Sequence, residues 1–333
     1  LAADTTHLYV ATAAANGFPL IRYPLAGPAN QDAGWIPNVN SGVDAIVLDG
    51  AGSLYVAGGF TVVQGTSHTG LARLSTAGGA AVDSQWAPTV LGWVGSLRLS
   101  GAHVYLAGRF RTSPGQAWSY LSRYAVAGNG TPDAGFAPAV GGGSTLVLLP
   151  GGIDSMHVGG RFTSISGQSR PALATVSLAN GQPTPLATAA EQRLAQVYAL
   201  MRQTDGGLLV GGRFTRVGTL PRLNLLRLGP DGSPDPSWRV DVDGPPVPYR
   251  GAPGDIQFEN DPSVAALAQD AEGRVYVGGG FAHVGGQLRA NLARLSADGL
   301  VDADWNPGAN GSVSDLLPDN LGNVYAAGNF TVI

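Results

Sequence analysis

The sequence predicts an all-β fold, a β-propeller built from four-stranded antiparallel blades. Three observations lead to this prediction: a motif repeated seven times, short segments in which apolar and polar residues alternate, and turn residues between those segments. The chain has 333 residues, of which 50 are Gly and 23 are Pro. Because 44% of the residues are apolar, the chain can also fill a core. We therefore expect a folded, turn-rich protein.

The repeated motif has the form apolar-Tyr-Val-Ala/Gly-Gly-x-Phe. Its copies end at Phe60, Phe110, Phe162, Phe214, Phe281 and Phe330, and a degenerate first copy ends at Ala14. Successive copies are thus 46 to 67 residues apart. Four-stranded units repeated at about this period are typical of propellers, whereas the coils of a β-solenoid, the alternative fold, are usually shorter.

Each repeat unit carries the landmarks of four strands. An alternating apolar stretch such as 43–49 precedes the motif, the motif itself is the second strand, and a run such as 70–74 follows as the third. A turn and an aromatic residue beside a Pro then mark the fourth. The Gly pair is expected to let the adjacent sheet approach closely, and the Phe to fill the space between blades.

The repeats define a single propeller domain over residues 1–333. The units span residues 1–42, 43–92, 93–142, 143–192, 193–262, 263–311 and 312–333, and the last unit is partial. A seven-bladed ring follows if the missing outer strands lie beyond this chain, which is then a piece of a longer protein. A six-bladed ring would leave two strands as an open edge, which invites aggregation.

The segment 273–313, GRVYVGGGFAHVGGQLRANLARLSADGLVDADWNPGANGSV, resembles the bacterial delta-60 repeat. The likeness extends over nearly the whole chain and is strongest in the second, fifth and sixth units. The Gly pair is also similar, more distantly, to that of kelch repeats. The resemblance implies a propeller in a large surface or secreted bacterial protein without an assigned activity, and it supplies no catalytic residue.

Five repeat units contain an Arg in the third strand and an Asp three residues before the aromatic residue of the fourth. The fourth unit has Thr175 and Pro183 instead, so it lacks both charges. Charges that disappear together are expected to be in contact, and we predict a salt bridge between the third and fourth strands of each of the five blades. The pairs are Arg22–Asp32, Arg73–Asp83, Arg123–Asp133, Arg227–Asp235 and Arg294–Asp302.

Composition excludes several classes of function. The chain has no Cys, which removes disulfide frameworks, thiolate metal sites and Cys nucleophiles. A net charge of −4 gives no reason to expect nucleic-acid binding, and no apolar run is long enough to predict a membrane span. The five His residues form no metal-binding or acid–base spacing, and no nucleophile or phosphate-binding motif is present. No cofactor is expected apart from a possible calcium ion.

Binding sites on a symmetric scaffold are expected where the repeats differ. The residue before the motif Phe is Arg109, Arg161 and Arg213 in three consecutive units, but Ala13, Gly59, Gly280 and Asn329 in the others. Three guanidinium groups at equivalent positions could hold an acidic glycan or an acidic protein segment. The alternative is that each pairs with a local carboxylate.

The fifth unit contains the second departure, an insertion over residues 241–262 that is rich in Pro, Gly and acids. We expect it on the face that carries the three Arg residues, where Tyr249 and Arg250 would add to the binding surface. Its carboxylates could supply oxygen ligands to calcium, although their spacing is not that of an EF-hand. They are Asp241, Asp243, Asp255, Glu259 and Asp261.

These observations favour a non-enzymatic, extracellular or cell-surface propeller module, structural or adhesive, that binds a protein or an acidic glycan through one loop face. A carbohydrate-active or lyase-type propeller enzyme is one alternative. A subunit of a surface filament or larger assembly is another. Converging acids, His or Tyr at one mouth of the propeller would favour the enzyme, and apolar surface at the rim would favour the assembly.

Overall fold

We analysed a computed structural model of the chain, which describes residues 1–12, 19–28, 30–184, 196–218, 220–244, 262–319 and 321–333. These residues form strands, turns and irregular segments, without a helix among them. Within that part of the chain there is accordingly no helix long and apolar enough to cross a membrane. The chain divides into two compact units. The first comprises 1–158, 162–169 and 176–183, and the second comprises 159–161, 170–175 and 184–333.

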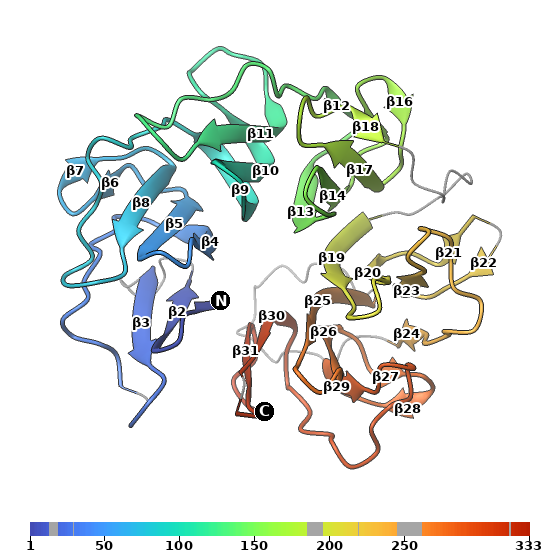
Figure 1. Cartoon of the computed structure of the whole chain (residues 1–333). Coiled ribbons are helices and arrows are strands. Elements are labelled where there is room, and N and C mark those ends of the chain that lie inside the picture. The colour runs from blue at the N-terminus through green and yellow to red at the C-terminus, as the bar shows by residue number, and fades with distance from the viewer. Residues whose placement is uncertain (13–18, 29, 185–195, 219, 245–261, 320) are drawn as a thin grey trace, which may run out of the picture. The chain divides into compact units, whose positions relative to one another are not determined.

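The first compact unit contains three sheets in which consecutive strands pair antiparallel (Figure 1). In each, the second strand lies in the middle. The sheets are β1 (Ala2–Ala3), β2 (His7–Ala11) and β3 (Leu20–Pro24); β4 (Val43–Leu48), β5 (Ser53–Gly58) and β8 (Leu71–Ser75); and β9 (Leu91–Ser100), β10 (His103–Arg111) and β11 (Ser119–Ala125).

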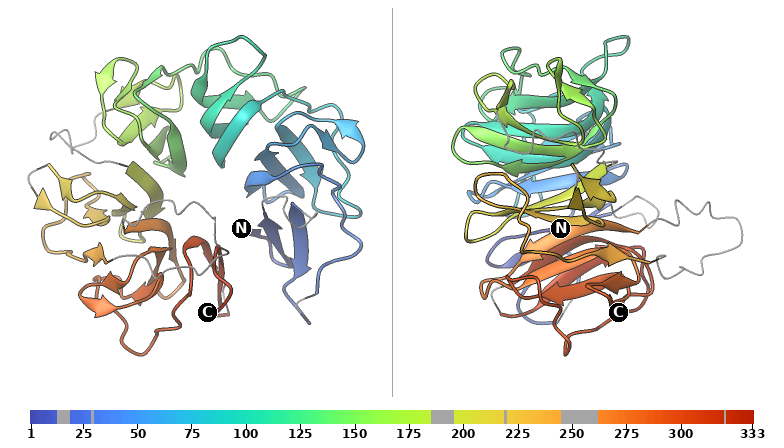
Figure 2. Two further views of the ribbon diagram at one scale, coloured as in Figure 1. Left: turned by 180° about the vertical axis from the view of Figure 1, so that it is seen from behind. Right: turned by 90° about the vertical axis from the view of Figure 1, so that its right-hand side faces the viewer.

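The second compact unit repeats the same strand order, and the separate sheets can be followed from two further directions in Figure 2. Its sheets are β19 (Gln196–Arg202), β20 (Leu208–Arg213) and β23 (Leu225–Leu228); β25 (Ser263–Gln269), β26 (Val275–Gly280) and β29 (Leu292–Leu295); and the pair β30 (Val313–Pro318) and β31 (Val324–Gly328). The residues of one further sheet are divided between the two units: β13 (Thr145–Pro150), β14 (Ser155–Gly160), β17 (Leu173–Ser177) and β18 (Pro183–Thr184).

The predicted fourth strand is shorter than the other three. It is a two-residue strand in β18 and elsewhere a single bridge: Leu74↔Val82, Tyr124↔Pro132, Leu228↔Pro234 and Leu295↔Val301. At two of these bridges the residue is Pro, which has no N–H to donate to a ladder. The outer edge of each sheet is therefore held by side chains as well as by backbone pairing.

Small accessory hairpins follow the motif Phe in four repeat units. Each places one apolar residue in the interior: Val63, Ile165, Val217 and Val284, all at most 2% exposed. The hairpins are β6 (Val62–Val63) with β7 (Thr66–Ser67), β15 (Ser164–Ile165) with β16 (Gln168–Ser169), β21 (Arg216–Val217) with β22 (Leu220–Pro221), and β27 (His283–Val284) with β28 (Gln287–Leu288). Two of them gain a third strand from the preceding repeat unit: β12 (Val140–Gly141) pairs with β15, and β24 (Val242–Asp243) pairs with β27.

The glycines of the motif serve two different contacts. A Cβ on the first Gly of the pair would meet side chains of the next sheet, at 2.5 Å from Val264 for Gly211 and at 2.7 Å from Val313 for Gly278. A Cβ on the second Gly would instead clash with a carbonyl of its own sheet. In the second repeat unit Ala57 takes the first position of the pair and Gly58 the second, and a Cβ on Gly58 would lie 2.1 Å from the oxygen of Gly42. The predicted close approach between sheets thus applies to the first Gly only. The second is required by a β-bulge in the preceding strand.

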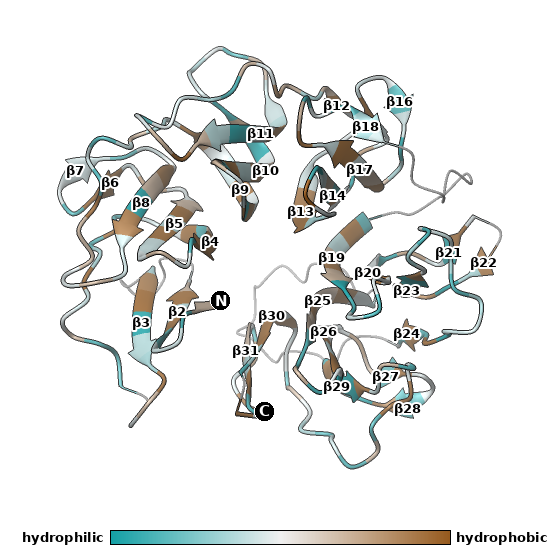
Figure 3. Ribbon diagram, in the orientation of Figure 1, coloured by the Kyte–Doolittle hydropathy of each residue, from teal (hydrophilic) through white to brown (hydrophobic). Residues whose placement is uncertain are grey.

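Apolar side chains fill the interior of each unit, and some strands, such as β13 and β17, are largely brown in the hydropathy view (Figure 3). The aromatic landmark of the fourth strand packs edge-to-face on an aromatic residue of the second strand, with centroids 5.1 to 5.4 Å apart, a geometry that aromatic pairs prefer. The pairs are Tyr9–Trp35, Tyr55–Trp86, Tyr105–Phe136 and Tyr276–Trp305.

Candidate functional site

The structure brings all five Arg–Asp pairs into contact. Arg Nε donates to Asp Oδ2 at 3.0 Å in Arg22–Asp32 and Arg73–Asp83, and at 2.8 Å in Arg123–Asp133 and Arg294–Asp302. In the fifth pair, Arg227 Nη1 donates to Asp235 Oδ2. The Asp also stabilises the turn that follows it, because its other carboxylate oxygen accepts the backbone N–H two residues later in each pair.

The same Arg residues also hold neighbouring sheets together. Arg73 Nη1 donates to the carbonyl of Val126 at 3.0 Å, and Trp86 Nε1 donates to the carbonyl of Ala125 at 2.8 Å. Both acceptors stand at the end of the third strand of the next sheet. Equivalent bonds join Arg22 to Thr76, Trp35 to Ser75, Arg123 to Leu178 and Trp238 to Ala297. These charges therefore belong to the scaffold.

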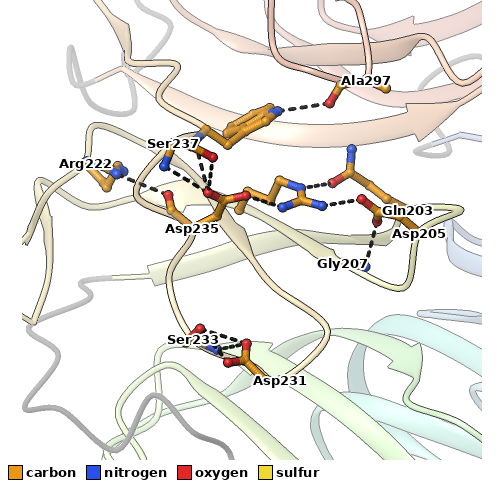
Figure 4. Close-up of polar contacts among 11 residues, drawn as sticks. Gln203, Asp205, Gly207, Arg222, Asp231, Ser233, Asp235, Ser237 and Ala297 are labelled. Atoms are coloured by element: carbon orange, nitrogen blue, oxygen red, sulfur yellow. Dashed lines mark hydrogen bonds and ion pairs between the residues drawn. The ribbon is translucent and has the colours of Figure 1, made fainter.

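Arg227 differs from its counterparts in the groups that it binds, among them Gln203 and Asp205, which are labelled in Figure 4. Its Nε donates to Gln203 at 2.7 Å, and its Nη2 contacts Asp205, so the guanidinium binds the turn between the first two strands of its own sheet. Arg222 lies nearby and donates through Nη2 to the carbonyl of Asp235 at 3.3 Å. The donors of Arg227 are thus all directed at groups of the fifth repeat unit.

The ion pairs make stability depend on pH. Hydrogen bonds from Arg123 and from the Gly135 N–H hold the pKa of Asp133 below its usual value. Arg294 does the same for the pKa of Asp302. A lowered pKa in the folded state means that the stabilisation is complete above the unfolded value of about 3.9 and is lost as pH falls through the folded value. We expect the midpoint of urea unfolding to decrease from about pH 5 downward.

Asp133→Asn should flatten this dependence, because it removes one carboxylate that the native state holds ionised. Urea titrations of both proteins between pH 3 and 6 measure the two slopes. Equal slopes would show that the Arg123–Asp133 pair contributes nothing to acid sensitivity.

The third sheet departs from the others in the segment after its motif Phe. At the position of the buried Val63 and Ile165 it carries Ser113, which is half-buried. The segment forms no accessory hairpin and instead continues the main sheet. Because this segment buries no apolar side chain in the interior, the hydrophobic effect does not favour the accessory hairpin here.

The strands of this sheet extend beyond the motif. Cα partners run on through Arg109↔Trp93 and Phe110↔Gly92 to Arg111↔Leu91, while Phe110 also pairs with Ser119 of β11. In the sheet of β4 and β5 the pairing ends at Gly58. Since side chains alternate along a strand, Arg109 and Arg111 lie on one face of β10, opposite the buried Phe110.

Two tryptophans flank these arginines, and we call Trp93, Arg109, Arg111 and Trp118 the Trp–Arg surface. The guanidinium carbons of Arg109 and Arg111 lie 4.1 and 4.7 Å from the centroid of the Trp118 ring, within the range of a cation–π contact. Trp93, the cross-strand neighbour of Arg109, is 41% exposed, and Trp118 is 38% exposed. The surface therefore presents aromatic rings and cations side by side.

The two guanidinium groups have no carboxylate partner among the residues that the structure describes. The Nε of Arg111 is buried and has no hydrogen-bond partner there. At the position of Trp118, the fifth and sixth units have Arg222 and Arg289, which are about 5% exposed and donate to backbone carbonyls. The third sheet thus exposes a large ring where the fifth and sixth units bury a bonded Arg.

The other predicted ligand residues lie in the second compact unit or outside the described residues. Arg161 is exposed and Arg213 is half-buried in β20, and both belong to the second compact unit, whereas Arg109 belongs to the first. A row of three guanidinium groups therefore stays a prediction. Tyr249 and Arg250 lie outside the described residues.

The predicted calcium ligands are only partly described. Asp241 accepts the Leu223 N–H at 3.1 Å and lies 3.4 Å from Arg239, and Asp243 lies 3.4 Å from His283. Asp255, Glu259 and Asp261 lie outside the described residues. In the rest of the chain, no three His or acidic side chains gather to form a metal site. Calcium binding by the insertion stays a prediction.

The sequence analysis identified Arg109 but missed Arg111 and both tryptophans. A signal for them is present, because Ser113 replaces an apolar residue and Trp118 replaces an Arg or His at equivalent repeat positions. Trp93 could have been found in the same way, since the equivalent residue is Gly42 in the second unit and Ser263 in the sixth.

Three segments of the chain, 52–79, 203–237 and 271–304, match the family model described as a domain of unknown function (DUF5122) beta-propeller. They fall in the second, fifth and sixth repeat units and together cover less than a third of the chain. No curated protein matches the sequence.

Two solved structures are similar to this chain over 98% of its length. The WD40 beta propeller domain of Doa1 has a TM-score of 0.57 at 9% identity, and the chain covers 86% of it. The extracellular domain of a one component system from B. thetaiotaomicron has a TM-score of 0.52 at 12% identity, and the chain covers 37% of it. Together with the family match, these likenesses confirm the predicted all-β propeller fold, and the chain contains repeats of a β-propeller family.

Proposed function

We propose that this propeller is a non-enzymatic binding module of an extracellular or cell-surface protein, and that it contacts a protein or an acidic glycan through the Trp–Arg surface. The observation that carries the proposal is the departure of the third sheet from its counterparts. At the position of Trp93 the second and sixth units have Gly42 and Ser263, and at that of Trp118 the fifth and sixth units have Arg side chains that are buried and donate to backbone carbonyls. We therefore infer that the exposed side chains of Trp93 and Trp118 are not needed to form the sheet.

The physical cost of the surface supports the same proposal. The exposed indole rings of Trp93 and Trp118 do not gain the free energy that burial would give them. Features that break local rules without benefit to the fold are typical of functional sites. Trp and Arg are also the residues most enriched where binding energy concentrates in interfaces.

The extracellular setting is supported by two likenesses. One similar structure is an extracellular domain, and the repeats resemble a family of surface and secreted proteins. The chain spans 37% of that extracellular domain.

Fluorine NMR of protein labelled with 5-fluorotryptophan tests this proposal directly. Of the six tryptophans, Trp35, Trp86 and Trp238 are buried and Trp305 is half-buried, so ligands should shift only the resonances of Trp93 and Trp118. Trp93→Phe and Trp118→Phe assign the two signals. Trigalacturonate, a heparin tetrasaccharide, cellotriose and an octapeptide of Glu serve as probes. If none of them moves either resonance at millimolar concentration, the proposed binding role is wrong.

A further inference from the structure

We infer that the Trp–Arg surface recognises uronic acid units, the carboxylate-bearing sugars of acidic glycans. This inference rests on the proposed function and specifies its ligand. A uronic acid unit carries a carboxylate at the edge of a ring whose faces present C–H groups. The surface offers a complementary group for each of these features.

The carboxylate is matched by the two guanidinium groups. The contacts with the Trp118 ring use no N–H group of Arg109 or Arg111 in a hydrogen bond to a carboxylate, so the terminal Nη groups can serve a ligand. A guanidinium group binds a carboxylate through charge-assisted hydrogen bonds, which are stronger than neutral ones. Stacking also restricts both side chains before the ligand arrives, which reduces the entropy lost on binding. In the described part of the chain, no Asp or Glu competes for these two groups.

The sugar ring is matched by Trp93. Its ring lies over Gly95, where an added Cβ would come within 2.3 Å of the ring atom Cη2, so the backbone supports one side of the indole. The side chain is nonetheless 41% exposed. A flat aromatic surface of this kind packs well against the C–H face of a pyranose ring. Trp93 and Arg109 are cross-strand neighbours, with Cβ atoms typically about 5 Å apart, so one sugar unit can contact both.

The combination favours a uronic acid over other acidic ligands. A peptide of acidic residues would satisfy the guanidinium groups but would give Trp93 no flat apolar partner. A neutral sugar would stack on Trp93 and leave both charges unpaired.

Isothermal titration calorimetry with trigalacturonate tests the inference. The double variant Arg109→Gln with Arg111→Gln should weaken binding at least about 10-fold, because hydrogen bonds to charged groups are lost. Arg109→Lys with Arg111→Lys should fall in between, since it keeps the charge but loses the paired donors. Trp93→Ala should weaken binding of trigalacturonate and of its neutral methyl ester alike. Circular dichroism verifies that each variant is folded.

The matched control is Arg239→Gln with Arg216→Gln, which removes the same charge from other exposed positions and should leave the affinity unchanged. The methyl ester of trigalacturonate should bind the wild-type protein at least about 10-fold more weakly than the acid. Equal affinity for acid and ester, or full affinity in the Arg109→Gln, Arg111→Gln protein, would overturn the inference.

The fluorine spectra separate this failure from that of the proposed function. If the Glu octapeptide or cellotriose, which contain no uronic acid, shifts the Trp93 and Trp118 resonances and trigalacturonate does not, the surface is a binding site for another class of ligand. The uronic acid assignment is then wrong, and the proposed function stands. If no probe shifts either resonance, both are wrong.

Discussion

Gly58→Ala is expected to lower the free energy of unfolding by about 3 kcal/mol, whereas Gly59→Ala should change it by less than about 1 kcal/mol. The two glycines are adjacent in the same motif. A Cβ on Gly58 would lie 2.1 Å from the carbonyl oxygen of Gly42 and 2.8 Å from the Cα of Val43. These are backbone atoms of a paired strand, so they cannot move aside without disrupting the sheet. A Cβ on Gly59 meets only the Ser41 hydroxyl, at 3.6 Å.

Urea unfolding monitored by Trp fluorescence measures both effects. Gly279→Ala provides an independent copy of the experiment, because its Cβ would lie 2.0 Å from the carbonyl oxygen of Ser263. Similar losses for Gly58→Ala and Gly59→Ala would show that the motif is selected for flexibility rather than for the approach of this strand.

Trp86→Ala should have the second large effect, a loss of about 3 to 5 kcal/mol, the usual range for truncation of a buried aromatic residue. Trp86 is fully buried, packs edge-to-face on Tyr55 at 5.1 Å, and donates to the carbonyl of Ala125 in the next sheet. The substitution removes the ring and leaves that carbonyl without its donor. Trp86→Phe should cost less, because the ring contact with Tyr55 is retained.

Trp118→Ala is the matched comparison, since it removes the same side chain from an exposed position. We expect it to change the free energy of unfolding by less than about 1 kcal/mol, because the ring is 38% exposed and packs on two guanidinium groups rather than in the core. A loss as large as that of Trp86→Ala would mean that Trp118 supports the sheet, and the argument for a ligand role would fail.

The sequence predicted the propeller because its repeats carry the same landmarks in the same order. The joint loss of charge in the unit containing Thr175 and Pro183 was sufficient to predict five Arg–Asp contacts. It could not predict that Arg73 also binds the carbonyl of Val126, since the position of one sheet against the next is set by packing rather than by local pattern. The repeats also did not indicate that a Cβ on Gly58 would clash with the backbone of its own sheet.

The candidate site was harder to predict than the fold. Arg109 stood out because it lies in the motif, where any difference between units is easily seen. Trp118 lies in a segment whose alignment depends on recognising Ser113 as the replacement of a buried apolar residue. The contact between Trp118 and Arg109 arises only when β10 and β11 continue past the motif, a change of pairing that the sequence pattern alone does not specify.

The bonds that Arg and Trp side chains make to neighbouring sheets all point in one direction along the chain. The side chains of an earlier sheet supply the N–H groups, and the backbone of the following sheet supplies the oxygens. This set of bonds is consequently polar. Removing a later repeat would leave the N–H of a buried Trp without its acceptor in the repeat before it, whereas removing an earlier one would free only the acceptor carbonyls of these bonds. Through these bonds, damage should therefore spread more readily from the C-terminal end toward the N-terminus than in the opposite sense.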